Sequence, residues 1–219
     1  VNLKIFWDFH NIKLIYYYFY HMIIEFYKYQ GTGNDFIIID DRSNAFDESD
    51  TALISALCAR RTGIGADGLI LLRNHEEYDF EMCYFNSDGY TSSMCGNGGR
   101  CVIDFARVLD IIHNEVTFMA VDGVHKGRVL DQGIALKMQD VHVIQKMDKG
   151  LFLDTGSPHY VLMVDELNTL DVVKEGRLIR NSANFIKKGV NVNFVLDGPE
   201  LELRTYERGV EDETLSCGT

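Results

Sequence analysis

The chain has 219 residues, enough for one large domain or for two small ones with their own cores. Apolar residues make up 46% and charged residues 25% of the sequence, which is typical of a folded globular protein and excludes a disordered or fibrous one. The 33 acidic against 21 basic residues give a net charge of −12, which argues against a nucleic acid or an anionic membrane as the partner.

The first 21 residues differ in composition from the rest and are rich in Tyr, Phe and Ile. Their uncharged run from Leu14 to Ile24 is too short for a membrane span, which needs about 20 apolar residues. A basic segment and a small-residue cleavage site, as in a signal peptide, are not evident. We interpret residues 1–21 as an extension of unknown role, ahead of a start at Met22.

Hydrophobic patterns predict the following elements in chain order. Short buried strands are expected at 36–39 and 69–72, with a helix at 50–61 between them. Alternation of apolar and polar residues predicts a strand at 79–85, and helical spacing predicts a helix at 98–109. Another alternating strand is expected at 201–206.

Four pairs of similar segments recur along the chain at nearly one offset. The offset is 123 for Gly33 and Gly156, 124 for Gly65 and Gly189, 121 for Phe85 and Tyr206, and 122 for Cys95 and Cys217. We infer a tandem duplication. The duplication predicts two similar α/β lobes, at residues 22–141 and 142–219. We expect the second lobe to be incomplete, because the helix after its cysteine is missing.

The five cysteines form no CxxC pair, which argues against a zinc knuckle and a thioredoxin-type site. We expect a reducing, cytoplasmic setting with free thiols. Cys58, Cys83 and Cys101 lie in apolar helical or strand patterns, and we interpret them as small buried hydrophobic residues.

Cys95 differs because three glycines follow it, in Gly96-Asn97-Gly98-Gly99, directly before the predicted helix. Glycine lets a backbone approach a ligand closely. The N–H groups at a helix start bind anions such as a carboxylate, and they favour the thiolate form of a nearby cysteine. Taken alone, the motif is also consistent with a tight turn before a core helix.

The duplication places Cys217-Gly218 at the equivalent point of the second lobe. Two cysteines on opposite sides of one cleft would suit inversion of a stereocentre, which needs a base on one face of a carbon and an acid on the other. N–H donors from two helix starts would stabilise the charge that develops on a neighbouring carboxylate.

Polar residues at the glycine turns form a further candidate set. Each alone is typical of a turn or cap, but as a set they could hold an ammonium group and a second carboxylate. They are Asn34, Asn86, Ser157, Asn191, Glu207 and Arg208. His159 is a secondary candidate, since a single histidine more often has a structural role.

Six segments together resemble diaminopimelate epimerase in the family's order and spacing, from about Met22 to the end. They are QGTGNDF (30–36), RTGIGADGLILL (61–72), FNSDGYTSSMCGNGGR (85–100), TGSPHY (155–160), GVNVNF (189–194) and YERGVEDETLSCGT (206–219).

The resemblance implies a mixed α/β fold of two pseudo-symmetric lobes, each a curved sheet around a central helix. It implies an isomerase that converts LL- to meso-2,6-diaminopimelate in lysine and peptidoglycan precursor biosynthesis, without pyridoxal phosphate or a metal. The expected partner is this small molecule, with no nucleic acid and no membrane, and a homodimer is compatible with the family.

The resemblance also assigns roles to residues. Cys95 and Cys217 would be the acid and base. The remaining roles are carboxylate binding by the backbones of Gly96, Asn97, Gly218 and Thr219, ammonium binding by Glu207, and substrate contacts by Asn34, Asn86, Asn191 and Arg208.

The sequence departs from the family in three respects. Ser157 stands where many members have Asn, and Gly68 where many have Gln. Family members continue for several tens of residues past the second cysteine. We therefore expect the chain as given to be a poor enzyme.

Three alternatives remain at this stage. A proline or hydroxyproline racemase-like enzyme would share the paired cysteines but not the surrounding motifs. A thiol redox protein would use the two cysteines as a reversible disulfide, with no role for the Asn, Glu and Arg residues. A binding module without catalysis is the third.

Overall fold

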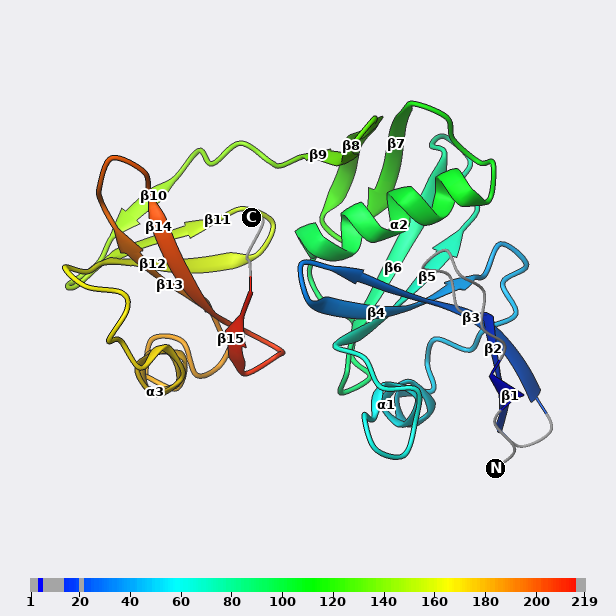
Figure 1. Ribbon diagram of the computed structural model, residues 1–219, viewed down its shortest axis with the longest axis horizontal. Coiled ribbons are helices and arrows are strands. Elements are labelled where there is room, and N and C mark those ends of the chain that lie inside the picture. The colour runs from blue at the N-terminus through cyan, green and yellow to red at the C-terminus, as the bar shows by residue number, and fades with distance from the viewer. Residues whose placement is uncertain (1–3, 6–13, 20–21, 216–219) are drawn as a thin grey trace. The chain divides into compact units, whose positions relative to one another are not determined.

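The computed structural model describes residues 4–5, 14–19 and 22–215, which form two compact units (Figure 1). Unit 1 ends at Lys137 and unit 2 begins at Met138. No helix in this described part of the chain is both long and apolar enough to cross a membrane.

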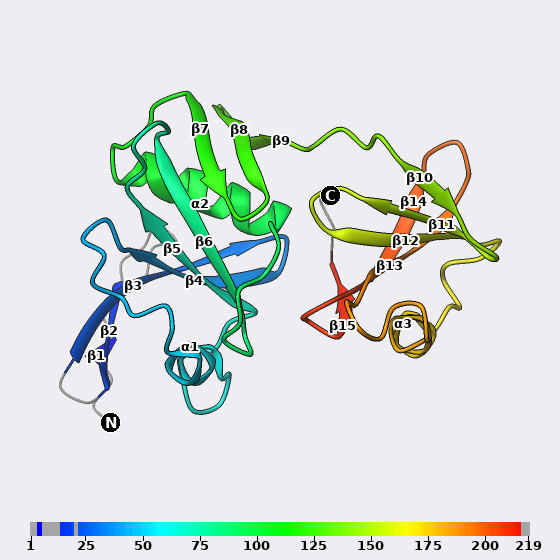
Figure 2. The same ribbon diagram turned by 180° about the vertical axis from the view of Figure 1, so that it is seen from behind.

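In its described residues, unit 1 is a nine-stranded mixed sheet in sequence order with two helices. Its elements are β1 (Lys4–Ile5), β2 (Leu14–Phe19), β3 (Met22–Gly31), β4 (Asn34–Asp40), α1 (Thr51–Cys58), β5 (Gly68–Arg73), β6 (Phe80–Asn86), α2 (Gly96–Val108), β7 (Glu115–Ala120), β8 (Gly123–Leu130) and β9 (Gly133–Lys137). The pairs β4–β5 and β6–β7 are parallel, and α1 and α2 are their crossovers. Both views show the sheet curling around α2, with α1 on its other side (Figures 1 and 2).

The two helices cover opposite faces of β4 and β5. One face packs against α2 through Phe36, Ile38, Ile70 and Leu72, and the other packs against α1 through Ile37, Ile39, Leu69 and Leu71. Successive strand residues point to opposite faces, so a strand that is buried on both sides has a continuous apolar run. This explains the short apolar runs at 36–39 and 69–72.

Both predicted helices of unit 1 form, but their ends differ from the prediction. Helix α1 ends at Cys58, three residues before the predicted end at 61, because the next turn folds back over its end. The N–H groups of Ile64 and Gly65 donate to the carbonyl of Leu57, and that of Ala66 donates to the carbonyl of Cys58. Helix α2 begins at Gly96 instead of residue 98, so the glycine motif belongs to the helix itself.

Unit 2 is a six-stranded sheet with one helix in its described residues. Its elements are β10 (Ile144–Lys146), β11 (Leu151–Asp154), β12 (Pro158–Met163), α3 (Val172–Arg180), β13 (Asn191–Leu196), β14 (Glu202–Glu207) and β15 (Asp212–Thr214). Only β12 and β13 are parallel among these strands, and α3 connects them. The sequence analysis did not predict α3.

The topology of the two units confirms the duplicated fold. The order β3, β4, α1, β5, β6 in unit 1 is repeated as β11, β12, α3, β13, β14 in unit 2, with the same strand directions. The register is repeated too: Phe36 pairs with Gly68 and His159 with Asn191, and 68 − 36 and 191 − 159 both give 32. Helix α3 is therefore the counterpart of α1.

One face of the unit 2 sheet is apolar and the other carries a buried polar cluster. Tyr206 and Phe194 lie in the apolar core with α3. On the polar face, Nδ1 of His159 lies 2.9 Å from Nδ2 of Asn193, and Oγ1 of Thr205 donates to Oδ1 of Asn193 at 2.9 Å. An amide nitrogen only donates, so Nδ1 of His159 accepts from Asn193 and the ring is neutral.

We expect Gly176→Ala to destabilise unit 2, although alanine favours a helix. A Cβ at Gly176 would lie 2.3 Å from Cβ and 2.5 Å from Cγ of Tyr206, closer than atoms can pack. Overpacking of this kind costs about 1–3 kcal/mol, more than the roughly 1 kcal/mol gained in helix propensity. Denaturant unfolding measures the difference, and Leu178→Ala, at a 61% exposed position of α3, is the near-neutral control. Unchanged or higher stability of Gly176→Ala would contradict the packing described here.

His159 should make the chain less stable in mild acid. Burial lowers its pKa from 6.5 to about 4, so the unfolded chain binds a proton more readily between these two pH values. The unfolding free energy should fall as pH drops from 6.5 towards 4, by up to about 3 kcal/mol. His159→Gln should be less stable at pH 7 but show a flatter pH dependence, whereas His113→Gln, at an exposed position, should keep the wild-type slope. An equal pH dependence of the unfolding free energy in His159→Gln and wild type would exclude His159 as its cause.

Candidate active site

Cys95 occupies the N-cap position of α2 in unit 1. Its backbone is extended, with φ −112° and ψ 121°, and its carbonyl accepts the N–H of Gly99 at 2.8 Å. Its Sγ lies 3.6 Å from Oδ1 of Asn34 and donates to it. The N–H groups of the first helical turn, which begins at Gly96 and Asn97, have no acceptor further back in the helix and can bind an anion.

A tight hairpin between β3 and β4 places Asn34 beside this helix start. Thr32 and Gly33 both have positive φ, 51° and 86°, as a two-residue turn between twisted strands requires. A Cβ at Gly31 would lie 3.2 Å from the carbonyl oxygen of Asn97, so the hairpin backbone packs directly on the first turn of α2. Asn34 is the first residue after the turn and is only 4% exposed.

The side chain of Asn97 ties the helix start to the hairpin. It is 3% exposed, and its Oδ1 accepts from Oγ1 of Thr32 at 3.4 Å and from the guanidinium of Arg100. This use of the side chain is compatible with a ligand role for the backbone N–H of Asn97.

A charged network that the sequence analysis missed lies behind Asn34. Nδ2 of Asn34 donates to Asp67 at 2.7 Å, and Arg60 contacts both Asp67, at 2.5 Å, and Asp35, at 2.8 Å. Lys28 contacts Asp35 at 2.7 Å. Burial alone would raise the pKa of Asp35, but the hydrogen bonds from Arg60 and Lys28 outweigh it and lower the pKa to about 2. The carboxylate of Asp35 is therefore ionised at neutral pH.

Of the other described cysteines, Cys58 and Cys101 lie in apolar surroundings, and Cys83 is half-buried beside the guanidinium of Arg73. Cys58 and Cys101 are 2% and 4% exposed, and burial raises the pKa of each thiol to about 12. Burial also raises the pKa of Cys83, to about 11. All three are free thiols in environments that disfavour a thiolate, in agreement with a packing role.

Asn86 ends β6 directly opposite Gly68 of β5. A Cβ at Gly68 would lie 2.5 Å from the ring of Tyr84 and 2.6 Å from the carbonyl oxygen of Phe85. Tyr84 thus fills the space that a side chain at position 68 would need, which explains why this chain carries glycine there.

Unit 2 brings Ser157, Asn191 and Arg208 together at the ends of its strands. Nδ2 of Asn191 donates to Oγ of Ser157 at 3.0 Å, and Oδ1 of Asn191 accepts the backbone N–H of Arg208 at 2.8 Å. Nε2 of His159 lies 3.4 Å from the same Nδ2 of Asn191. Ser157, Asn191 and His159 are all buried, so the cluster is rigidly packed.

Glu207 and Arg208 follow each other at the end of β14, where both are half-buried. The guanidinium of Arg208 donates to the carbonyl of Lys188 at 3.1 Å. Cys217, Gly218 and Thr219 lie outside the described residues. The structure therefore places one group of predicted residues in unit 1 and another in unit 2, and each group stands by itself.

Asn193 and Thr205 also belong to the polar cluster of unit 2, although the sequence analysis did not name them as site residues. Asn193 lies two positions after Asn191 in β13 and therefore on the same face. The alternation in GVNVNF is the signal that could have identified it.

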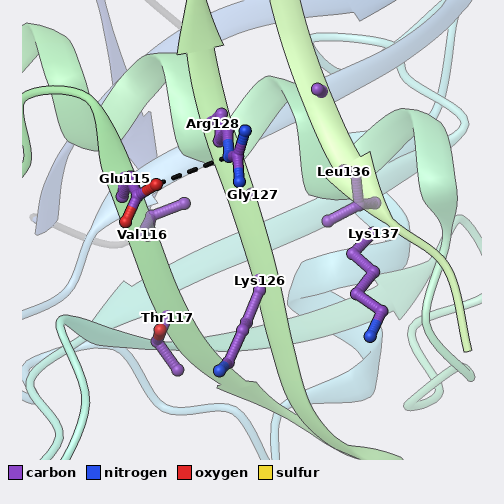
Figure 3. Close-up of a pocket in the computed structure, with 9 residues that line it drawn as sticks. Glu115, Val116, Thr117, Lys126, Gly127, Arg128, Leu136 and Lys137 are labelled. Carbon is purple, nitrogen blue, oxygen red and sulfur yellow. Dashed lines mark ion pairs between the residues drawn. The ribbon is translucent and has the colours of Figure 1, made fainter.

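A separate concavity of about 560 Å³ lies on the outer face of β7, β8 and β9 (Figure 3). Lys126, Arg128 and Lys137 line it, and Arg128 forms an ion pair with Glu115 at 3.4 Å. None of the predicted site residues borders it, so this concavity is not part of the site around Cys95.

Two solved structures resemble this fold. A phenazine biosynthesis protein of the PhzF family from Bacillus anthracis superposes with a TM-score of 0.66 at 14% identity, over 90% of this chain and 76% of that one. Methylitaconate-delta-isomerase superposes with a TM-score of 0.53 at 11% identity, over 90% and 78% of the two chains. At such low identity these similarities concern the fold alone.

Sequence comparison is more specific. The family model described as diaminopimelate epimerase matches residues 26–143 and 151–219. The diaminopimelate epimerase of Flavobacterium psychrophilum is 53% identical over 199 residues, which cover 90% of this chain and 78% of the relative. That of Aquifex aeolicus is 42% identical over 217 residues, with the same coverage. This chain belongs to the diaminopimelate epimerase family.

Proposed function

We propose that this chain converts LL-2,6-diaminopimelate to meso-diaminopimelate by acid/base catalysis between Cys95 and Cys217, a step of lysine and peptidoglycan precursor biosynthesis. The observation that carries the proposal is the position of Cys95 at the start of α2, beside Asn34, in a chain that matches the family over both Cys-Gly motifs. The chain is accordingly an isomerase, and its partner is a small molecule.

In this mechanism, one cysteine is a thiolate and the other a thiol. The thiolate removes the Cα proton from one face of the substrate, and the electron pair of the broken C–H bond remains on Cα and its carboxylate. The thiol then delivers its proton to the opposite face, which inverts the centre. The proton count is unchanged, and the two cysteines have exchanged protonation states.

Formation of the carbanion is the least favourable step, because a negative charge on Cα next to a carboxylate is very unstable. The N–H groups of Gly96 and Asn97 at the start of α2 would bind that carboxylate, with Gly218 and Thr219 as their counterparts. Thiol chemistry and these donors suffice for proton transfer, so the proposal includes no pyridoxal phosphate and no metal.

The remaining candidates would bind the rest of the substrate. Glu207 would hold the ammonium at the reacting centre. Asn34, Asn86, Ser157, Asn191 and Arg208 would supply amide, hydroxyl and guanidinium groups to the substrate, several of them at its distal, non-reacting end. A reducing cytoplasm would keep both cysteines reduced, with no disulfide between them, which the mechanism needs.

Cys95→Ser should abolish exchange of the substrate Cα proton. Incubation of the reduced chain with LL-diaminopimelate in deuterium oxide, followed by NMR, measures loss of the Cα signal and formation of the meso isomer. Because a serine hydroxyl is a far weaker acid than a thiol, the rate should fall at least about 100-fold. Cys83→Ser, at a half-buried thiol outside the site, is the matched control and should retain the wild-type rate.

Equal exchange by Cys95→Ser and wild type would exclude Cys95 as the acid/base residue. Exchange on proline but not on diaminopimelate would replace the substrate assignment by that of a proline racemase-like enzyme. No exchange on either substrate would overturn the proposal for this chain.

A further inference from the structure

The side chain of Asn34 connects Cys95 to the charged network of unit 1. Sγ of Cys95 lies 3.6 Å from Oδ1 of Asn34, and Nδ2 of Asn34 lies 2.7 Å from Oδ2 of Asp67. Asn34 is 4% exposed, and the side chain of Asp67 is 15% exposed. These hydrogen bonds are therefore shielded from water, which strengthens their effect on the groups that they join.

The contact with Asp67 determines which end of the Asn34 amide faces the sulfur. An ionised carboxylate only accepts hydrogen bonds, so the NH₂ group of Asn34 has to point to Asp67. The carbonyl oxygen, Oδ1, then necessarily faces Cys95. An oxygen acceptor pairs with an S–H donor and repels a thiolate.

Asp67 is itself held in place by several contacts. Its Oδ1 accepts from Arg60 at 2.5 Å, and its Oδ2 accepts the backbone N–H of Asp35 at 3.2 Å. The backbone N–H of Asp67 donates in return to Oδ1 of Asp35 at 3.1 Å. This reciprocal pair joins the starts of the parallel strands β4 and β5, so Asp67 belongs to the rigid part of the sheet.

We propose that Asp67 is a positioning residue, which fixes the amide of Asn34 so that it stabilises the protonated thiol of Cys95. This inference rests on the proposed function for its meaning in catalysis. In the reaction direction in which Cys95 enters as the protonated thiol, it is the acid that delivers a proton to the carbanion, and the other cysteine is the base. The S–H bond of Cys95 breaks as the new Cα–H bond forms, and Cys95 is left as the thiolate.

Charged groups of both signs are connected to this thiol, so some favour its protonated form and others its thiolate. Through Asn34, they are Asp67 and Asp35 with Arg60 and Lys28. On the side of α2, Arg100 donates to the side chain of Asn97 in the first helical turn. A test has to separate the orientation of Asn34 from the simple removal of a negative charge.

Asp67→Asn should shift Cys95 towards the thiolate. The new amide would keep its oxygen towards the charged Arg60 and turn its NH₂ group to Asn34, at the loss of the longer hydrogen bond from the backbone N–H of Asp35. Asn34 would then flip and present its own NH₂ to the sulfur. The measurement is the pH dependence of iodoacetamide alkylation at Cys95, quantified by peptide mass spectrometry so that the other cysteines do not interfere. The midpoint should move to lower pH by about 0.5–1 unit, the change that one hydrogen bond produces.

Asp35→Asn is the matched control. It removes one negative charge from the same carboxylate pair and disturbs the contact with Arg60 that both carboxylates share, but it leaves the Asn34–Asp67 hydrogen bond in place. Its midpoint should stay at the wild-type pH. Asn34→Leu removes the acceptor and leaves the carboxylate of Asp67 in the chain. It should lower the midpoint as Asp67→Asn does, and the double variant should show no further shift.

An unchanged midpoint in both Asp67→Asn and Asn34→Leu, with wild-type circular dichroism, would overturn the proposal. Equal shifts in Asp67→Asn and Asp35→Asn would overturn it too, because they would show a general charge effect. The alkylation reading needs no substrate, so the positioning role can hold even where the exchange experiment with diaminopimelate fails.

Discussion

The first turn of α2 packs against the inner face of the unit 1 sheet, and the geometry around Cys95 depends on this contact. A Cβ at Gly98 would lie 3.2 Å from Ile70 and 3.3 Å from Met82, and one at Gly31 would lie 3.2 Å from the backbone of Asn97. Larger residues would push the helix start away from the hairpin that carries Asn34. Glycine is unfavourable in a helix, so its presence here reflects the close approach and not helix propensity.

The repeat made the fold predictable, whereas the ends of its helices depend on contacts that a sequence pattern does not contain. Similar segments at one offset indicate two lobes because duplicated strands keep the same register, as the pairs Phe36–Gly68 and His159–Asn191 do. The end of α1 is set by N–H groups that return from Ile64 and Gly65. Helix α3 escaped prediction because Gly176, a weak helix former, is required by its contact with Tyr206, thirty residues later.

The same distinction applies to the site. Cys95 and Asn34 were predictable because each lies in a local motif, a glycine-rich helix start or a glycine turn before a strand. Asp35 lies in β4, Arg60 follows the end of α1 and Asp67 directly precedes β5, and the three meet only in the folded sheet. The sequence contains 33 acidic residues, and nothing in their spacing says which of them meets an arginine.

A cysteine that serves as acid in one direction of a reversible epimerisation and as base in the other needs both of its protonation states within reach. The helix start favours the thiolate of Cys95, and Oδ1 of Asn34 favours the thiol. These two influences oppose each other, and proton transfer in both directions requires that neither protonation state be strongly disfavoured. Cys58 and Cys101 experience burial without such a helix start, and the pKa of each rises to about 12, too high to supply a base near neutral pH. The position of Cys95 between a helix start and an oriented amide therefore distinguishes it from the buried Cys58 and Cys101 of the same unit.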